Sequence, residues 1–253
     1  MAENLILTGP DGSNYPFLGV SSVSIRKQGG GRAEYGTGGG GGLFGPLVDR
    51  SIESITAEDL AGITEIGSHA FEECWSLYSV SLPSGLQSIG ASSFDSCPIQ
   101  GISLPSTLEV IDSYAFRGTS LQSVTIPSSL QRLGVGTFAY TRLTNLVIPE
   151  VVDTGFGVGF DASEVASGCG YLQSIDLPST TEYMVNGPFF MCSALTEIIC
   201  RASTPPYVDN TTFTYRQWTL PTNQVTIFVP SGSVTDYRAA QYWGNYNIKA
   251  IPT

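Results

Sequence analysis

Histidine is almost absent from this chain, because His69 is the only one among 253 residues. Catalytic triads and histidine-ligated metal sites need more imidazoles, so both classes of enzyme are disfavoured. The five cysteines include no C-x-x-C pair of the kind that binds zinc. We therefore expect no metal ion and no cofactor, and we interpret His69 as a solvated turn residue.

Long apolar runs and basic side chains are also scarce. No stretch of about 18 apolar residues is present, so no transmembrane helix is expected. The opening, MAENLILTGPDG, lacks the basic start and the apolar stretch of a secretory signal. Residues 51–200 hold sixteen acidic and three basic side chains, a formal net charge of −13, which repels phosphate backbones and anionic lipid. Neither nucleic acid nor membrane insertion is expected.

Motifs for an enzyme are weak. GTGGGG (36–41) satisfies G-x-G-x-x-G, but it follows no strand pattern and opens no helix pattern, so we do not interpret it as a nucleotide site. A glycan hydrolase that uses paired carboxylates stays open as a remote alternative. Its candidate acids would be Glu72, Glu73, Asp95, Glu109, Asp112, Asp161 and Glu164.

One short phrase, in contrast, recurs through the middle of the chain. It reads SVSLP (79–83), GISLP (101–105), SVTIP (123–127) and NLVIP (145–149), and the four prolines are 22 residues apart. SIDLP (174–178) and EIIC (197–200) extend the series. A fixed period in the low twenties predicts a solenoid, in which each coil buries its apolar side only against its neighbours.

Each repeat predicts one strand and one aromatic core position. In the first coil Val80 and Leu82 alternate with Ser79 and Ser81, so one face of a short strand is apolar and the other is small and polar. Stacked coils should align these strands into a parallel sheet. A phenylalanine then recurs on the far side of the core at positions 71, 94, 116, 138 and 189.

The cysteines follow the same period. Four of them, Cys74, Cys97, Cys169 and Cys192, come three residues after the phenylalanine position, and threonine fills that position in two other coils. We interpret it as a slot for a small inward side chain and expect free buried thiols. Disulfides within adjacent pairs stay an alternative, since neighbouring coils lie about 5 Å apart, within bridging range.

The segments IGSHAFEEC (66–74), IGASSFDSC (89–97) and IDSYAFRGT (111–119), each followed by an sLxsVxLP strand, closely resemble the BspA-like leucine-rich repeat family. The resemblance covers about residues 60–200. It implies a mainly β fold with minor α: a leucine-rich-repeat solenoid of about six coils with a parallel β-sheet on one face. It also implies a role in adhesion or binding.

The expected organisation has four parts. Residues 1–28 form an N-terminal arm with a possible hairpin, and 29–46 form a glycine-rich linker or arm. Residues 47–200 form the solenoid, entered through a segment in which Thr56 could cap a helix. Residues 201–253 form a loop and an α/β cap that closes the open end of the core, with Ser233 as helix cap, Tyr237 and Tyr242 facing the core, and Gly244 as the stop.

The fifth coil departs from the pattern. It carries about seven extra residues in GFGVGFDASEVASGCG (155–170), and Ala166 stands where phenylalanine is expected. Insertions in solenoids map to loops on one face and often carry recognition, although a tolerated loop is an equal alternative. We expect the binding surface at this insertion and the 203–218 loop, with Phe156, Phe160, Tyr171, Tyr207, Phe213, Tyr215 and Trp218 as its aromatic anchors.

These observations favour a non-enzymatic structural or adhesion protein in a larger assembly, possibly a homo-oligomer. The leading hypothesis is a bacteriophage virion component, since the opening also resembles repeat proteins carried by phages and prophages. Residues 1–50 would contact other virion or surface proteins, and the repeats would bind a host surface protein or a neutral glycan. A bacterial cell-surface adhesin is the alternative. The candidate assembly anchors are Tyr15, Phe17, Tyr35 and Phe44.

Overall fold

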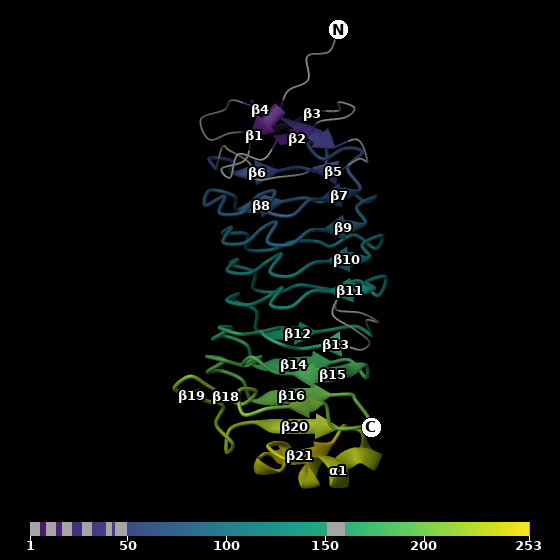
Figure 1. Cartoon of the computed structure of the whole chain (residues 1–253), viewed down its shortest axis with the longest axis vertical. Helices are drawn as coiled ribbons and strands as arrows, with labels where there is room; N and C mark the ends of the chain where they lie inside the picture. The colour runs from purple at the N-terminus through teal and green to yellow at the C-terminus, as the bar shows by residue number, and fades with distance from the viewer. Residues whose placement is uncertain are drawn as a thin grey trace.

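The computed structural model describes residues 6–8, 14–16, 22–26, 32–38, 42–43, 50–150 and 160–252, the first five segments as backbone strands only. The molecule is an elongated stack of coils, with the N-terminal strands at one end and the C-terminal helix at the other (Figure 1). The solenoid has about eight turns, because capping turns flank the repeats recognised in the sequence. The predicted fold class is confirmed.

The repeat phrase forms a ladder of parallel strands. Its strands are β12 (Asn145–Val147), β14 (Ser174–Leu177), β16 (Glu197–Cys200), β20 (Thr226–Val229) and β21 (Asn247–Ala250), paired in that order. Nearer the N-terminus β6 (Ser54–Ile55) pairs with β8 (Ser79–Val80). Leu146, Ile175, Ile198 and Ile227 occupy one register and are buried, as the alternation predicts.

The sequence predicts a strand at every repeat phrase, and in two coils this is wrong. Residues 101–105 and 123–127 are not in strands, and Ile102, Leu104 and Val124 are only partly buried there. The coils in this stretch are joined by a second ladder that the single predicted sheet does not include.

The second ladder is formed by the residues that precede the coil glycine or its equivalent. β5 (Gly42–Leu43), β7 (Glu65–Ile66), β9 (Ser88–Ile89), β10 (Val110–Ile111) and β11 (Arg132–Leu133) pair in parallel. After the insertion it resumes as β13 (Phe160–Asp161), β15 (Thr181–Met184) and β17 (Tyr207–Val208). The solenoid therefore has strands on two faces, and these two-residue pairs were too short to recognise by alternation.

The third face consists of turns, and hydrogen bonds join these turns from coil to coil as well. In the first turn the amides of His69, Phe71 and Glu73 donate to carbonyls of the next coil at 2.8 Å each. Two residues in each of the first four turns have positive φ, for example His69 (61°) and Glu73 (55°). This left-handed geometry lets alternate amides point along the stack, so polar residues and glycine are favoured at these positions.

Behind the turns the phenylalanines form a continuous stack. The rings of Phe71, Phe94, Phe116 and Phe138 follow one another with centroid separations of 5.2, 5.4 and 5.9 Å and nearly parallel planes. All four side chains are fully buried. Full burial of each contributes about 2–3 kcal/mol in transfer terms, so this stack is a main source of solenoid stability.

The small inward slot next to the stack is also confirmed. All five cysteines are free thiols and buried. In the slot the thiols of Cys97 and Cys192 donate to carbonyls of the preceding coil, Phe71 at 3.0 Å and Ala166 at 3.0 Å. The hydroxyl of Thr119 donates instead within its own turn, to the Phe116 carbonyl at 2.8 Å. Cysteine and threonine are therefore alternative solutions to the same local requirement.

Protonated buried thiols and phenols predict alkaline instability. Burial raises the pKa of Cys200 to about 11 and of Tyr246 to about 12, and it also raises the pKa of Cys97 and Cys192. The folded chain therefore keeps protons that the unfolded chain releases above about pH 8.5 for thiols and about pH 10 for tyrosine. The free energy of unfolding should be fully present below pH 8.5 and fall as pH rises.

Urea denaturation midpoints at pH 7, 9 and 10 measure this loss. A chain with Cys97→Thr and Cys192→Thr, the residue that fills the slot in two other coils, should keep more of its stability at pH 10. A midpoint that does not change between pH 7 and pH 10 would contradict the prediction.

The N-terminal arm contains more strand than expected. β1 (Ile6–Thr8) and β2 (Asn14–Pro16) pair antiparallel, which agrees with the expected hairpin. β3 (Ser22–Arg26) and β4 (Arg32–Gly38) form a second hairpin, and β4 also pairs with β5. Parts of the segment interpreted as a glycine-rich linker are therefore strands that lead into the second ladder.

The entry segment carries a turn and no helix. The Thr56 hydroxyl accepts from the Asp59 amide at 3.2 Å, and the Asp59 carboxylate accepts from the Thr56 amide at 2.8 Å. This reciprocal arrangement resembles a capping box, but residues 57–62 continue as turns. The expected helix start at Thr56 is wrong.

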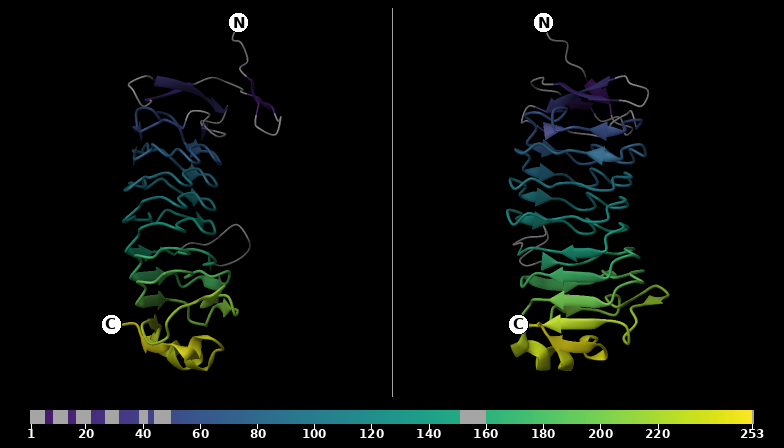
Figure 2. Two further views of the ribbon diagram at one scale, coloured as in Figure 1. Left: turned by 90° about the vertical axis from the view of Figure 1, so that its left-hand side faces the viewer. Right: turned by 180° about the vertical axis from the view of Figure 1, so that it is seen from behind.

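The C-terminal cap covers the last coil at the end of the stack (Figure 2), and the largest side chains that it buries are aromatic. It contains η1 (Ser231–Ser233), α1 (Val234–Ala239) and η2 (Trp243–Asn245), preceded by a hairpin of β18 (Thr214–Tyr215) and β19 (Trp218–Thr219). Tyr237 and Trp243 are fully buried, and their rings meet edge to face at 5.0 Å.

Two expectations about this cap are wrong in detail. Ser233 makes no side-chain capping bond, because its hydroxyl donates to the Ser203 carbonyl at 2.6 Å. Gly244 does not stop the helix, which ends at Ala239. Glycine is needed at 244 because a Cβ would lie 2.4 Å from the Arg238 carbonyl oxygen. Tyr237 faces the core as predicted, and Tyr242 packs against it while partly exposed.

Candidate functional site

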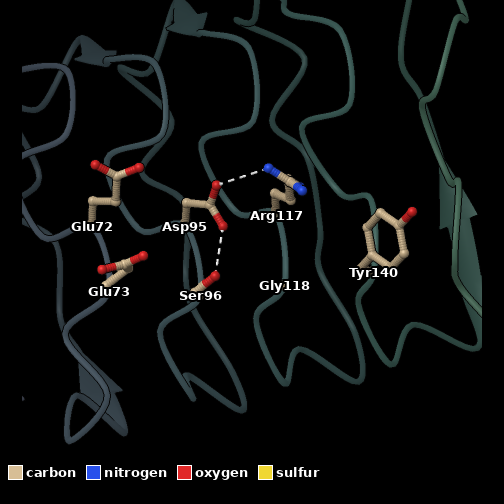
Figure 3. A pocket seen from close by; sticks show the side chains of 7 residues that line it. All are labelled: Glu72, Glu73, Asp95, Ser96, Arg117, Gly118 and Tyr140. Carbon is tan, nitrogen blue, oxygen red and sulfur yellow. Dashed lines mark hydrogen bonds and ion pairs between the residues drawn. The ribbon is translucent and has the colours of Figure 1, made fainter.

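An open pocket lies on the turn face of the first four coils. We call it the turn-face pocket; it has a volume of about 390 Å³. Figure 3 shows its side chains coming from four successive turns, with carboxylates at one end and a tyrosine at the other. It is lined by Glu72, Glu73, Asp95, Ser96, Arg117, Gly118 and Tyr140.

The pocket results from a break in a side-chain pattern. The second left-handed position of each turn is held by Glu73, Ser96, Gly118, Tyr140 and then Gly168. The Tyr140 ring covers Gly168, where a Cβ would lie only 2.3 Å from the ring. Tyr114 covers Gly136 in the same way, at 2.4 Å. Gly118 has only Ser96 as the preceding residue, so the surface above its backbone is open.

The carboxylates around the pocket already have partners within the chain. Glu72 lies 2.9 Å from the His69 imidazole, and Glu73 pairs with Arg50. Asp95 accepts from Arg117 at 3.4 Å and from the Ser96 hydroxyl at 2.9 Å. Burial raises the pKa of Asp95, and the bonds from Ser96 and Arg117 partly offset this. The pocket is therefore polar but largely charge-balanced.

Arg117 is held by aromatic side chains. Its guanidinium carbon lies 5.6 Å from the Tyr114 ring centroid and 5.8 Å from that of Tyr140. Tyr114 in turn donates its hydroxyl to Glu164 of the fifth coil at 3.2 Å, and burial and Glu164 raise its pKa. Arg117 makes a single side-chain hydrogen bond within the described residues, so most of its donors remain for a ligand.

Of the acids considered for hydrolysis, the structure brings Glu72, Glu73 and Asp95 to one pocket. Asp112 pairs with Arg132 at 2.9 Å, and Asp161 lies on β13 and accepts from the Ser163 amide. Within the described ranges no three side chains of histidine, cysteine, aspartate or glutamate are placed so that together they could hold a metal ion. The arrangement suits noncovalent recognition of polar groups.

A second, shallower hollow of about 320 Å³ lies on the repeat face where the strands are missing. Small polar side chains and partly buried apolar ones line it: Ile102, Ser103, Leu104, Ser106, Ser123, Val124, Thr125 and Pro127. None of these side chains is charged or aromatic. Because aromatic and arginine side chains dominate the binding energy of tight interfaces, this hollow is the weaker candidate site.

The structure separates the predicted aromatic anchors into two groups. Tyr171 and Tyr207 are exposed, at 62% and 61%. Phe160 and Phe213 are buried in the core, so their assignment to a binding surface is wrong. Phe213 packs against Trp243 of the cap at a centroid separation of 5.4 Å. Trp218 is partly buried against Phe190.

Six other predicted residues carry no side-chain description. Phe156, Phe17 and Phe44 lie outside the described residues. Tyr15 on β2, Tyr35 on β4 and Tyr215 on β18 are described by backbone alone. Their assignments as binding or assembly anchors stay predictions.

Sequence reasoning expected Tyr207 at the binding surface but did not show that it pairs with Tyr183, which is also exposed. They are in register on β15 and β17, with ring centroids 6.2 Å apart. The signal was present, because both lie at matching places in successive coils, but the second ladder had to be recognised first. Arg117 and Tyr114 were missed because a turn pattern does not show which side chains cross to the next coil.

No helix in the described part of the chain is long and apolar enough to cross a bilayer.

Comparisons with known proteins agree with this architecture. The leucine-rich repeat protein of T. pallidum is 24% identical, covering 87% of this chain and 89% of that chain with a TM-score of 0.52. A leucine-rich repeat protein from Bacteroides ovatus is 15% identical (92% and 71% covered, TM-score 0.48), and the pneumococcal vaccine antigen PcpA is 18% identical (84% and 45% covered, TM-score 0.47). No curated protein matches the chain.

The chain also matches a protein family over most of its length. The description "BspA type Leucine rich repeat region" fits six copies, over residues 48–155 and 162–232. These ranges contain the phenylalanine stack, the cysteine slot and most strands of both ladders. The chain belongs to the BspA-type leucine-rich repeat family.

Proposed function

We propose that this chain is a non-enzymatic adhesion module, which binds a partner through aromatic side chains on rigid coils. One observation carries the proposal: exposed tyrosines lie side by side on the sheet of β13, β15 and β17, over a continuous core. Solenoids present extended surfaces of this kind for binding. Exposed tyrosines on a rigid support supply contact area at low entropic cost, and tyrosine is enriched among residues that dominate binding energy.

The proposed recognition surface consists of Tyr183 and Tyr207, with the neighbouring strand β13 at its edge. Tyr183 is 47% exposed and Tyr207 is 61% exposed. Asp161 on β13 is in register with Tyr183, so the surface continues onto β13. The role of this insertion in recognition rests on the sequence.

The double variant Tyr183→Ala/Tyr207→Ala should reduce binding to target cells by at least about tenfold, the loss of about 1.4 kcal/mol or more. Flow cytometry of the fluorescently labelled full chain on a panel of intact bacterial and epithelial cells measures this. The melting temperature should hardly change, because both side chains are largely exposed.

Tyr78→Ala is the matched control, because Tyr78 is exposed at the other end of the repeats. It should leave cell binding unchanged. A wild-type chain that binds no cell type of the panel would overturn the proposed function, and equal binding by the double variant would overturn the proposed surface. Deleting residues 155–165 is not a clean alternative, because it removes buried Phe160 and Ala162.

The narrower form of this proposal places the chain in a virion, anchored by residues 1–50, with a cell surface as the alternative. Its support is the resemblance of the opening to phage-carried repeat proteins. Immunogold labelling with antibodies against the chain, on purified phage particles and on cell envelopes, distinguishes the two. Labelling of cell envelopes without labelling of phage particles would overturn the assignment to a virion.

A further inference from the structure

We infer that the turn-face pocket binds a single neutral hexopyranose ring of a glycan. This inference rests on the proposed adhesion function and names a ligand class for a site distinct from the proposed Tyr183/Tyr207 surface. It is carried by the ring-sized gap above Gly118, by the polar groups around that gap, and by their charge balance.

At two other left-handed glycines of the turns, the chain itself places a six-membered ring over the backbone. Tyr114 lies over Gly136 and Tyr140 lies over Gly168, each in van der Waals contact with a left-handed glycine. Gly118 has the same left-handed geometry, with φ of 67°, and the three atoms nearest to a Cβ built there all belong to Ser96: its hydroxyl at 3.3 Å and its Cα and amide nitrogen at 3.5 Å. A flat ring can therefore lie on the Gly118 backbone as the tyrosines lie on the other two glycines.

The groups around the gap match the hydroxyls of a pyranose. Ser96 and Asp95 lie on one side, and Arg117 lies beside them with most of its donors free. Carboxylate and guanidinium groups make paired hydrogen bonds, which suit adjacent hydroxyls on a sugar ring. Tyr140, which is 48% exposed, offers an aromatic surface for the C–H face of the sugar.

The charge balance favours a neutral sugar over a charged ligand. A basic peptide would need free carboxylates, yet Glu73 and Asp95 are paired with Arg50 and Arg117, and Glu72 lies against the His69 imidazole. A uronic or sialic acid would be repelled, because these carboxylates surround a single lining arginine. Uncharged hydroxyls can use the remaining donors and acceptors without breaking any of the three pairs. The volume of about 390 Å³ lies in the range of small-ligand sites.

A substitution that fills the gap tests the inference. Ser96→Tyr places a ring above Gly118 in the manner of Tyr114 over Gly136. Position 96 should tolerate tyrosine, because Ser96 has a φ of 62° and Tyr114 and Tyr140 adopt 60° and 58° in the following coils. The matched control is Met191→Tyr, which adds the same ring at the same turn position, at φ 58°, away from the pocket.

The probes are the methyl glycosides of glucose, galactose, mannose and N-acetylglucosamine, each at about 10 mM because single-ring sites bind weakly. Saturation-transfer NMR on the full chain should show binding of at least one of them. That signal should fall at least fivefold in Ser96→Tyr and persist in Met191→Tyr. Circular dichroism confirms that both variants fold.

Three results would overturn the inference: no saturation transfer to any methyl glycoside, an undiminished signal in Ser96→Tyr, or shifts of pocket resonances by tetralysine but by none of the sugars. The proposed function fails separately. If the wild-type chain and Ser96→Tyr bind cells equally well and no methyl glycoside shows saturation transfer, the sugar site is wrong. The proposed adhesion function is then still supported.

Discussion

Replacing Phe116 by alanine should lower the free energy of unfolding by about 3–5 kcal/mol, the range for truncating a buried phenylalanine. Phe116 is fully buried, and its ring lies between those of Phe94 at 5.4 Å and Phe138 at 5.9 Å. The substitution removes ring contacts on both sides at once and leaves a cavity in the middle of the stack. Neighbouring coils are held at their spacing by backbone hydrogen bonds on either side of it, so they cannot collapse to fill the space.

Urea denaturation followed by circular dichroism gives the change in unfolding free energy. The control Tyr171→Ala removes an aromatic side chain that is 62% exposed, and it should change stability by less than about 0.5 kcal/mol. A loss for Phe116→Ala no larger than this control would show that the stack does not hold the coils together.

Trp243→Ala in the C-terminal cap should have a comparable effect, about 3–5 kcal/mol, but a different distribution along the chain. Trp243 is fully buried and meets Tyr237 and Phe213 edge to face, and its indole nitrogen donates to the Pro206 carbonyl at 3.3 Å. Because each coil contacts only its neighbours, loss of the cap should open the solenoid from its end.

Hydrogen exchange measured by mass spectrometry distinguishes these two variants. In Trp243→Ala the amides of β20 and β21 should lose protection first, while those of β9 and β10 stay protected. In Phe116→Ala the central coils should lose protection instead. Uniform loss of protection in Trp243→Ala would mean that the whole solenoid unfolds as one cooperative unit.

The milder variant Tyr237→Phe separates the polar from the apolar part of the cap. It removes the hydroxyl that donates to the Ala202 carbonyl at 2.9 Å and leaves the ring in place. An expected loss of about 1–3 kcal/mol follows from leaving a buried acceptor unpaired. The difference between this variant and Trp243→Ala measures what aromatic packing adds.

The sequence alone predicted which side chains face the core, because every coil of the solenoid repeats the same pattern of inward-facing residues. A period of 22 residues fixes which side chains face inward, and Leu77, Ile99 and Leu121 are all fully buried as expected. The cysteine slot was predictable for the same reason, since a position filled by cysteine in four coils and threonine in two must be small and inward. Each coil shows again which residue types are accepted at a given position.

The candidate sites were less predictable, because they depend on side chains of different coils meeting across the stack. Phe160 was expected on the surface and is in the core, since the insertion in coil five shifts the point at which the repeat pattern resumes. Arg117 and Tyr140 lie in successive turns, and nothing in their spacing indicates that the guanidinium contacts the ring.

The sequence by itself determined the solenoid, its apolar core, its small inward slot and its acidic body, because these follow from periodicity and composition. Only the tertiary structure decided that strands form on two faces and that a pocket opens above Gly118. Strand pairing between coils depends on the twist and spacing of the whole stack, and the pocket depends on which turn lacks a side chain large enough to cover the next glycine. Both are relations between neighbouring coils, and the pattern of a single repeat does not contain them.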